Sequence, residues 1–560
     1  MVLVFVGLGV LAMVSIVGWS STNSTLNFRS NQYHRTTAAA EAAMEKVLSR
    51  ILDDYKNANE PTVLANLGTY ATLVPTSTED TDWANFVFSD AQGNTNRTYV
   101  QRTVAPSFVD LDSAYAGLKG FASTYRIVSN AREATSRFTI TGAVQQDLQL
   151  ASVPIFQFAV FYNGDMELNG ASTLHIRGRV HGNSHLYTGS SANQYFYEDV
   201  TVSGAVIHGP RYGYTTNGTV DYAEGYHTNV ATMTLPIGTN NTSDAVREVI
   251  QLPPDGESTT SAMGRERYYN KAEMLILVSN ATVTVGLKDP LDTTYTTVPW
   301  TMCSNFISTN VTFRDQRENK DMVTTQIDVA KFSSWAATNS TVGDVLGSGN
   351  VPNVLFVADN RTVTSSKLNA VRLINGQTLP NRGLTVATPN PLYTIGHYNQ
   401  PTSSHLGTTN TSNTRPASLV CDAYTLLSGS FADTASTNSY TTRVAQNTTV
   451  VAAVLTGNVP SAANYSGGIN NLPRLLEHWN SSPQKTFTLN GSLVCLFTSA
   501  RATSPFQLPG AYYSAPSRNI NFDMNFTQEA GLPPGTPCLR VLQRGRWTTP
   551  PPNTTTYAGL

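Results

Sequence analysis

The start of the chain passes from an unbroken apolar run to a periodic apolar pattern. Residues 1–19 contain no charged side chain, and the first charged residue is Arg29. Further on, apolar residues recur at spacings of three and four, which predicts one apolar stripe along an amphipathic helix. The stripe consists of Ala40, Ala43, Met44, Val47, Leu48, Ile51, Leu52 and Tyr55. We therefore expect one long helix over residues 1–56.

The apolar run is long enough to cross a membrane. A helix rises about 1.5 Å per residue, so roughly eighteen residues reach about 27 Å, close to the thickness of a bilayer core. A secretory signal peptide needs a basic stretch before its apolar run and a small-residue cleavage site after it. Neither flanks this run. We expect the segment to be retained, with Met1 as a processed end from which a short basic leader has been cut.

The large apolar residues of this run cannot all face water, because burying each one is worth about 1.5–3 kcal/mol. We expect them in lipid or against copies of the same segment, and a plain membrane anchor is the alternative. The predicted polymerisation residues are Met1, Val2, Leu3, Val4, Phe5, Val6, Leu8, Val10, Leu11, Met13, Val14, Ile16 and Val17. Gly18, Ser20 and Ser21 are poor helix formers, so the helix should be weakest there and extended in a polymer.

These residues resemble a known family. The apolar run, the polar patch after it and the sequence TAAAEAAME at residues 37–45 resemble the N-terminal helix of type IV pilins, in their PilX-like branch. Two later blocks, residues 383–399 and 473–479, resemble patterns in large PilX-like bacterial surface proteins with a long β-rich part. Most major pilins have Glu at the fifth mature position, whereas this chain has Phe5. That difference favours a minor subunit or another register device.

The resemblance implies two successive locations for the protein, first the inner membrane and then an extracellular filament. A prepilin peptidase would remove the leader, and the subunit would be stored in the inner membrane. The pilus assembly machinery would then build it into an extracellular filament on the bacterial cell surface, with the helices bundled at the centre. The expected partners are therefore copies of the chain itself, the inner membrane and that machinery.

The amino-acid composition argues against a nucleic-acid-binding protein and favours a β-rich fold. Charged residues make up 13% of the 560 residues and the net charge is −2, so no basic field exists to attract nucleic acid. The chain is rich in Thr, Asn, Ser, Gly and Tyr, which favours short strands and turns. The predicted fold class is α+β, with a long pilin-like helix ahead of a large, mainly β body.

The β body divides into three predicted parts: a small β-rich subdomain at 57–150, a solenoid-like domain at 151–400 and a C-terminal β-rich domain at 401–560. Residues 151–230 alternate short apolar runs with Gly and Asn, which is typical of parallel β-solenoid rungs. A meandering antiparallel sheet is the alternative. One helix is predicted within the body, at Val329–Thr338.

Four cysteines are present, and none forms a C-x-x-C motif. Cys421 and Cys495 each follow Ser-Leu-Val in a strand-like run, which suggests a disulfide between them; the alternative is that both are small buried apolar residues. Two charge pairs are also expected to fix the C-terminal fold. They are Arg474 with Glu477, and Arg518 with Asp523.

Signatures of catalysis are weak. No metalloprotease H-E-x-x-H pattern and no phosphate-binding loop occurs. The carboxylates that a β-solenoid glycan-active enzyme would need are scattered among predicted turns, and so are four histidines. These residues are Asp165, Glu167, Asp221, Glu224, His175, His181, His185 and His208. We expect no catalytic, cofactor or metal site. The predicted function is a structural filament subunit, and the alternative is a minor or tip pilin or a membrane-anchored adhesin.

Overall fold

The structure is a computed structural model, and the chain folds as two compact units. It describes residues 1–90, 92–111, 115–168, 171–209, 211, 218–233, 242–289, 292, 294–462, 465–469, 472–507 and 512–551. Unit 1 is Met1–Val153 together with Leu539–Leu560, and unit 2 is Pro154–Cys538. Unit 2 is therefore an insertion in the chain of unit 1. The predicted α+β class is confirmed, since a long N-terminal helix precedes a body of several sheets.

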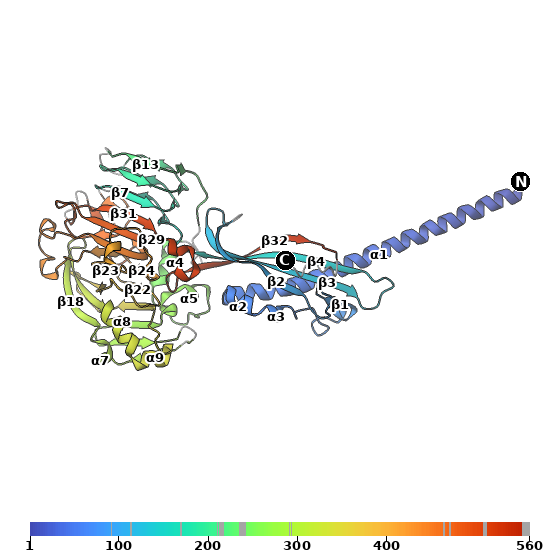
Figure 1. Cartoon of the computed structure of the whole chain (residues 1–560), viewed down its shortest axis with the longest axis horizontal. Helices are drawn as coiled ribbons and strands as arrows, with labels where there is room; N and C mark the ends of the chain where they lie inside the picture. Colours follow the sequence, from blue (N-terminus) through green and yellow to red (C-terminus); the bar gives the residue numbers. More distant parts are fainter. Residues whose placement is uncertain are drawn as a thin grey trace. The chain divides into compact units, whose positions relative to one another are not determined.

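Helix α1 (Val2–Asn57) dominates unit 1, and only its second half lies against the rest of that unit (Figure 1). Short helices α2 (Glu60–Ala65), α3 (Leu67–Tyr70) and η1 (Thr81–Asn85) follow it. The side chain of Asn59 accepts a hydrogen bond from the backbone N–H of Thr62, so this residue caps the start of α2.

The five-stranded sheet of unit 1 covers the apolar stripe of α1. Its strands are β1 (Phe86–Ser89), β2 (Tyr99–Asp110), β3 (Lys119–Glu133), β4 (Thr141–Pro154) and β32 (Cys538–Thr548). β3 pairs antiparallel with β1, β2 and β4, and β32 lies beside β4. The strand before unit 2 (β4) and the strand after it (β32) are thus neighbours in this sheet.

The predicted stripe is confirmed. All its members are buried except Leu52, which is half-buried, and they contact Tyr125 and Ile127 of β3 and Leu148 of β4. The helix also passes very close to the backbone of Gly142. A Cβ atom added to Gly142 would lie 2.4 Å from the backbone nitrogen of Thr37. A glycine is therefore needed where the helix crosses the start of β4.

Two large sheets form most of unit 2. The strands of the first, in order along its main path, are β13 (Val220–Tyr222), β10 (Gln194–Phe196), β7 (Leu174–Arg177), β31 (Ser517–Phe522), β29 (Thr486–Thr498), β26 (Thr448–Asn458), β24 (Ala417–Cys421), β22 (Leu384–Ala387), β20 (Val354–Asp359), β15 (Met274–Val278), β16 (Val283–Leu287) and β17 (Thr296–Val298). The strands of the second are β18 (Ile307–Asp315), β19 (Lys320–Asp328), β21 (Lys367–Ile374), β23 (Leu392–Ile395), β25 (Tyr424–Leu427) and β28 (Arg474–Leu475). In the first sheet, every pair of neighbouring strands between β13 and β15 in this order is parallel. In the second sheet, every pair between β19 and β28 is parallel.

Residues 160–227 add three parallel ladders whose strands are short. The strands not yet named are β5 (Val160–Tyr162), β8 (Val180–Gly182), β11 (Val200–Val202), β14 (Tyr226–His227), β6 (Met166–Glu167), β9 (Leu186–Tyr187) and β12 (Val206–Ile207). Val160 pairs with Val180, and Val180 pairs with Val200, so successive partners lie twenty residues apart. The pairing is parallel, so the antiparallel alternative does not apply here. The β-solenoid itself stays a prediction.

The short strand β5, near the start of unit 2 in the sequence, pairs with β29, which lies near the end of unit 2 in the sequence. The first half of β29 pairs with β31, and its second half pairs with β5. One column of buried side chains consequently crosses the whole stack. Its members, in register from strand to strand, are Met274, Leu355, Val386, Leu419, Val454, Leu493, Val160, Val180 and Val200.

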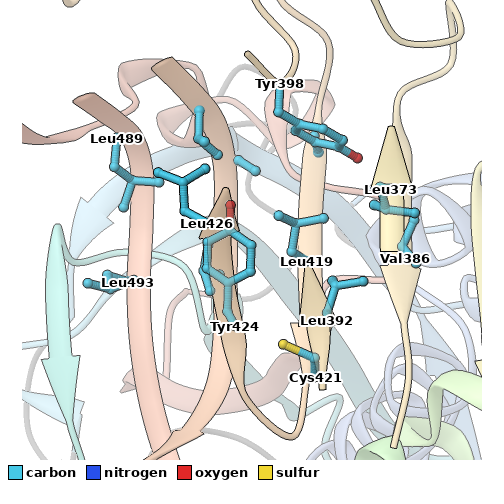
Figure 2. Packing of buried hydrophobic residues seen from close by; sticks show 14 of the residues in the cluster. Leu373, Val386, Leu392, Tyr398, Leu419, Cys421, Tyr424, Leu426, Leu489 and Leu493 are labelled. Carbon is cyan, nitrogen blue, oxygen red and sulfur yellow. The ribbon is translucent and has the colours of Figure 1, made fainter. Parts of the chain in front are cut away.

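The core of unit 2 lies between the two sheets. Figure 2 shows Val386 and Leu419 of the first sheet close to Leu392 of the second, with Tyr398 and Tyr424 beside them. Helices of unit 2 are α4 (Ser243–Arg247), α5 (Ala262–Glu266), α6 (Tyr268–Lys271), α7 (Trp300–Cys303), α8 (Val329–Thr338) and α9 (Ser340–Leu346). The predicted helix at Val329–Thr338 is confirmed as α8, with the side chain of Asp328 accepting the Lys331 N–H at its start.

The close approach at Gly142 gives a stability prediction. Gly142→Ala should destabilise unit 1 by about 1–3 kcal/mol, because the new methyl group meets backbone atoms that cannot move aside. Thermal unfolding of the detergent-solubilised chain, followed by circular dichroism, measures the effect.

The matched control is Gly68→Ala, in α3, where nothing lies within 4 Å of the added Cβ. It should leave unfolding unchanged or raise stability by about 0.5–1 kcal/mol. Equal unfolding midpoints for the two variants would contradict the close packing at Gly142.

Candidate assembly surface

The first half of α1 is an apolar surface that this chain leaves uncovered. Every large apolar side chain in residues 1–28 is at least 56% exposed, including all the predicted polymerisation residues. This part of α1 is long and apolar enough to cross a membrane, and none of it is buried. At about 1.5 Å per residue, it is about 42 Å long. An exposed patch of this size marks a site of membrane or protein contact.

The helix is continuous through the predicted weak point at Gly18, Ser20 and Ser21. Hydroxyls in this region bond back to the helix itself. Ser15 donates to the Leu11 carbonyl, Thr22 to Gly18 and Thr25 to Ser21, each at 2.9 Å. Such bonds satisfy the hydroxyls without water, but they compete with the backbone ladder. Extension of this stretch in a polymer stays a prediction.

Polar residues mark where the exposed half ends. The guanidinium of Arg29 lies 5.6 Å from the centre of the Phe138 ring. The Gln32 side chain donates to the Phe138 carbonyl at 2.7 Å, and Arg35 pairs with Glu133 at 3.1 Å. The sequence pattern did not single out these anchoring residues, although they include the first charges after the apolar run.

Ion pairs hold the polar face of the docked half. Lys46 pairs with Glu79 at 2.7 Å, which lowers the pKa of that carboxyl, and Glu45 pairs with Arg544 of β32 at 2.6 Å. The hydroxyl of Tyr70 donates to Asp54 at 2.7 Å, and burial together with this bond raises the pKa of Tyr70. The second half of α1 is thus fixed to unit 1 on its apolar and polar faces.

The disulfide suggested for Cys421 and Cys495 is not present, because both thiols are free and buried in the structure. Cys421 pairs in register with Thr456 of β26, and Thr456 pairs with Cys495. Two strand spacings amount to about 9.6 Å, and cysteines more than about 7 Å apart cannot be bridged without backbone movement. The thiol of Cys421 instead lies 3.7 Å from the hydroxyl of Thr456, and burial raises its pKa to about 12.

The two expected charge pairs also differ in the structure. Arg474 pairs with Glu318 at 2.5 Å rather than with Glu477. Glu477 accepts hydrogen bonds from the backbone N–H and the hydroxyl of Ser428, each at 2.6 Å. Asp523 accepts from Thr411 at 2.8 Å rather than from Arg518. Arg474 and Glu477 are three residues apart in the chain, and Arg518 and Asp523 are five apart. Because extended backbone rises about 3.3 Å per residue, such separations carry the two side chains away from each other.

The carboxylates named as candidates for glycan chemistry do not share one surface. Asp165 pairs with Arg211 at 2.5 Å, at a cavity of about 490 Å³ that Tyr162, Asn163 and Asn458 also line. Glu167 is buried and accepts from Ser461. Asp221 and Glu224 are exposed on and beside β13.

Each of the four histidines bonds to a neighbouring side chain or backbone group. The ring of His181 lies 2.8 Å from the Thr201 hydroxyl and 2.9 Å from the side-chain amide oxygen of Asn183, and burial lowers its pKa to about 4. His175 stacks on Tyr195, and His185 accepts from the Ala205 N–H. His208 lies 3.4 Å from the Thr188 hydroxyl. Within the described ranges, no group of three or more potential metal ligands is found.

Comparison with known proteins adds little to this geometry. No family description and no curated protein matches the chain. Among solved structures, the competence-associated pilin ComZ from Thermus thermophilus is similar, with a TM-score of 0.30 and 12% identity. The alignment covers 93% of this chain and 98% of that one. A likeness at this TM-score carries no argument, so we infer the function from the exposed half of α1.

The environment of Glu477 gives a pH prediction. Burial raises the pKa of this carboxyl to about 7, from 4.5. Between those values the folded chain holds a proton that the unfolded chain releases, so stability should fall as pH rises from about 4.5 to 7. By linkage the fall is roughly 3 kcal/mol. Glu477→Gln should flatten this part of the curve.

Thermal unfolding midpoints of the parent and variant, measured at several pH values between 4.5 and 8, test this. Glu529→Gln, at an exposed carboxyl, is the control and should keep the parent slope. A Glu477→Gln variant with an unchanged slope would show that the carboxyl is ionised throughout this range.

Proposed function

We propose that this chain is a pilin-like structural subunit that polymerises through residues 1–28 of α1. The observation that carries the proposal is the exposure of every large apolar side chain in that segment, next to a second half that is fully docked. The residues of the exposed half include no acid or base before Arg29. Copies of the same segment, bundled together, would cover this surface without burying a charged side chain.

Two small residues on the exposed segment are compatible with a helix bundle. A Cβ atom added to Gly7 or Gly9 would have nothing within 4 Å, so a neighbouring helix can approach the backbone there. Apolar residues surround these glycines on all sides of the helix. A subunit in a bundle would therefore find contacts in every direction, as a filament core requires.

The same segment would sit in the inner membrane before assembly, and the assembled filament would lie outside the cell on the bacterial surface. The partners in this proposal are sister copies, the membrane and the assembly machinery. Unit 2 would then be the part that the filament displays. The proposed role is structural and does not include catalysis.

A minor or tip pilin, or a membrane-anchored adhesin, is the second candidate, because residues 1–28 contain no carboxylate to pair with a neighbour's amino terminus. The amount of protein in filaments separates the candidates. A full-length band that dominates sheared filaments supports the main subunit, and a trace band supports the minor one.

A charge placed in the exposed half should block assembly. Leu11→Lys puts an ammonium group at a position that is 66% exposed in the single chain and buried in the proposed bundle. A charge in an apolar layer costs about 2.5–3.5 kcal/mol, which corresponds to roughly a hundredfold weaker binding of a subunit to the filament end. Electron microscopy and gel analysis of sheared filaments measure the loss.

Ser49→Lys is the matched control, since it adds the same group to an exposed position on the docked half of the same helix. It should leave the filament yield unchanged. The protein present in the membrane fraction is measured for both variants, so that failed insertion is recognised. Filaments at the parental level from Leu11→Lys would contradict the proposal.

A further inference from the structure

A buried arginine in unit 2 lacks the partners that its charge requires. Arg518 lies on β31, where its Cα partners are Phe487 of β29 and Leu174 of β7. Both neighbours belong to the core, so the guanidinium points into the interior, and the residue is 1% exposed. Nη2 lies 3.4 Å from the hydroxyl of Tyr513. Nε and Nη1 have no acceptor among the described residues.

The carboxylates beside Arg317, the other guanidinium next to Tyr513, are already engaged. Asp315 accepts from the backbone N–H groups of Arg317 and Glu318 and from the hydroxyl of Tyr393. Glu318 accepts from Arg474 and from the backbone N–H of Ser504. Two buried guanidiniums, those of Arg317 and Arg518, lie beside Tyr513. Three further buried charges, Arg474, Asp315 and Glu318, lie around Arg317, so the group comprises three guanidiniums and two carboxylates.

This region has an excess of positive charge. Burial, together with the nearby Arg474, lowers the pKa of Arg317 to about 9. Arg443, which also interacts with Asp315, has Glu477 as its acidic neighbour, and because burial raises the pKa of Glu477 to about 7, this pair does not reduce the excess. An arginine cannot shed its proton in a protein, so Arg518 cannot be neutralised that way. An uncompensated buried charge costs several kcal/mol.

A second donor without an acceptor lies close along the backbone. The indole Nε1 of Trp479 is buried and has no partner among the described residues, and Trp479 is 0% exposed. The Trp479 carbonyl accepts from the Lys485 N–H at 2.8 Å, and the Lys485 carbonyl accepts from Ser517 at 3.0 Å. Ser517 directly precedes Arg518. A second buried side chain that can only donate thus lies in the same unit, on a segment linked by backbone hydrogen bonds to the residue before Arg518.

We propose that unit 2 binds a small inorganic anion of the halide class at Nε and Nη1 of Arg518, inside the core between its two sheets. The anion completes the charge balance of the Arg317, Arg474, Arg518, Asp315 and Glu318 cluster. Because Arg518 is almost fully buried among large side chains, the occupant is a single small ion. Its role is structural: it stabilises the strand β31, on which the N-terminal rung β7 stacks.

Chloride dependence of stability tests the proposal on the full chain in detergent. Sodium gluconate, whose anion is too large for the site, is replaced by sodium chloride at constant ionic strength, and thermal unfolding of unit 2 is followed. The parent midpoint should rise by several degrees with chloride, because an ion that binds only the folded state stabilises it. Arg518→Met should unfold at a lower temperature than the parent in chloride and should show no rise.

Arg415→Met is the matched control, as it removes an exposed arginine of the same unit and should keep the chloride effect. Arg518→Met could fail to fold, so the second measurement uses the parent protein. Crystals grown in sodium bromide should give an anomalous peak beside Nη1 of Arg518. The proposal is overturned if no bromide peak occurs there, or if Arg518→Met is as stable as the parent at every chloride concentration.

Discussion

Apolar surface that one chain cannot cover has to be covered by lipid or by another chain, and this requirement governs the whole of unit 1. The docked half of α1 buries its stripe against β3 and β4, while the half before Arg29 has no partner in the described chain. The change between the two falls within one unbroken helix. Gln32 and Gly142 fix its position, the first by bonding to the loop before β4 and the second by letting the helix approach closely. A rigid connection of this kind transmits the position of the exposed half directly to the sheet.

The insertion of unit 2 between β4 and β32 separates two tasks within one chain. Because the strands before and after the insertion are neighbours in the sheet of unit 1, that sheet can close whatever lies between them. Unit 2 has its own core, a column of aliphatic side chains that continues from strand to strand. Its N-terminal rungs complete that column by stacking on β29, so the two ends of unit 2 depend on each other. Among the described residues, the two core clusters have no side chain in common.

The sequence predicts the parts of this fold whose contacts are local. The stripe from Ala40 to Tyr55 follows from helical spacing alone, and α8 was predicted to the residue because its apolar positions and the preceding Asp328 are all nearby. Contacts between strands that lie far apart in the sequence cannot be predicted in this way. Cys421 and Cys495 occupy similar local contexts, yet the strand that carries Thr456 lies between them, and no local pattern gives that order. The hydrogen bonds of Glu477 and the pairing of β5 with β29 depend in the same way on which strands lie side by side in space.

The proposed filament role explains why the exposed half of α1 lacks charged side chains and why three of its hydroxyls bond back to the helix. A segment stored in lipid and later buried among sister helices meets no water in either place. Its polar side chains must therefore find partners within the helix, as Ser15, Thr22 and Thr25 do by bonding to carbonyls one turn earlier. The bonds of Thr22 and Thr25 go to Gly18 and Ser21, in the stretch with the weakest helix propensity. The hydroxyls thus keep a polar alternative available to the backbone at the point where the helix is predicted to be weakest.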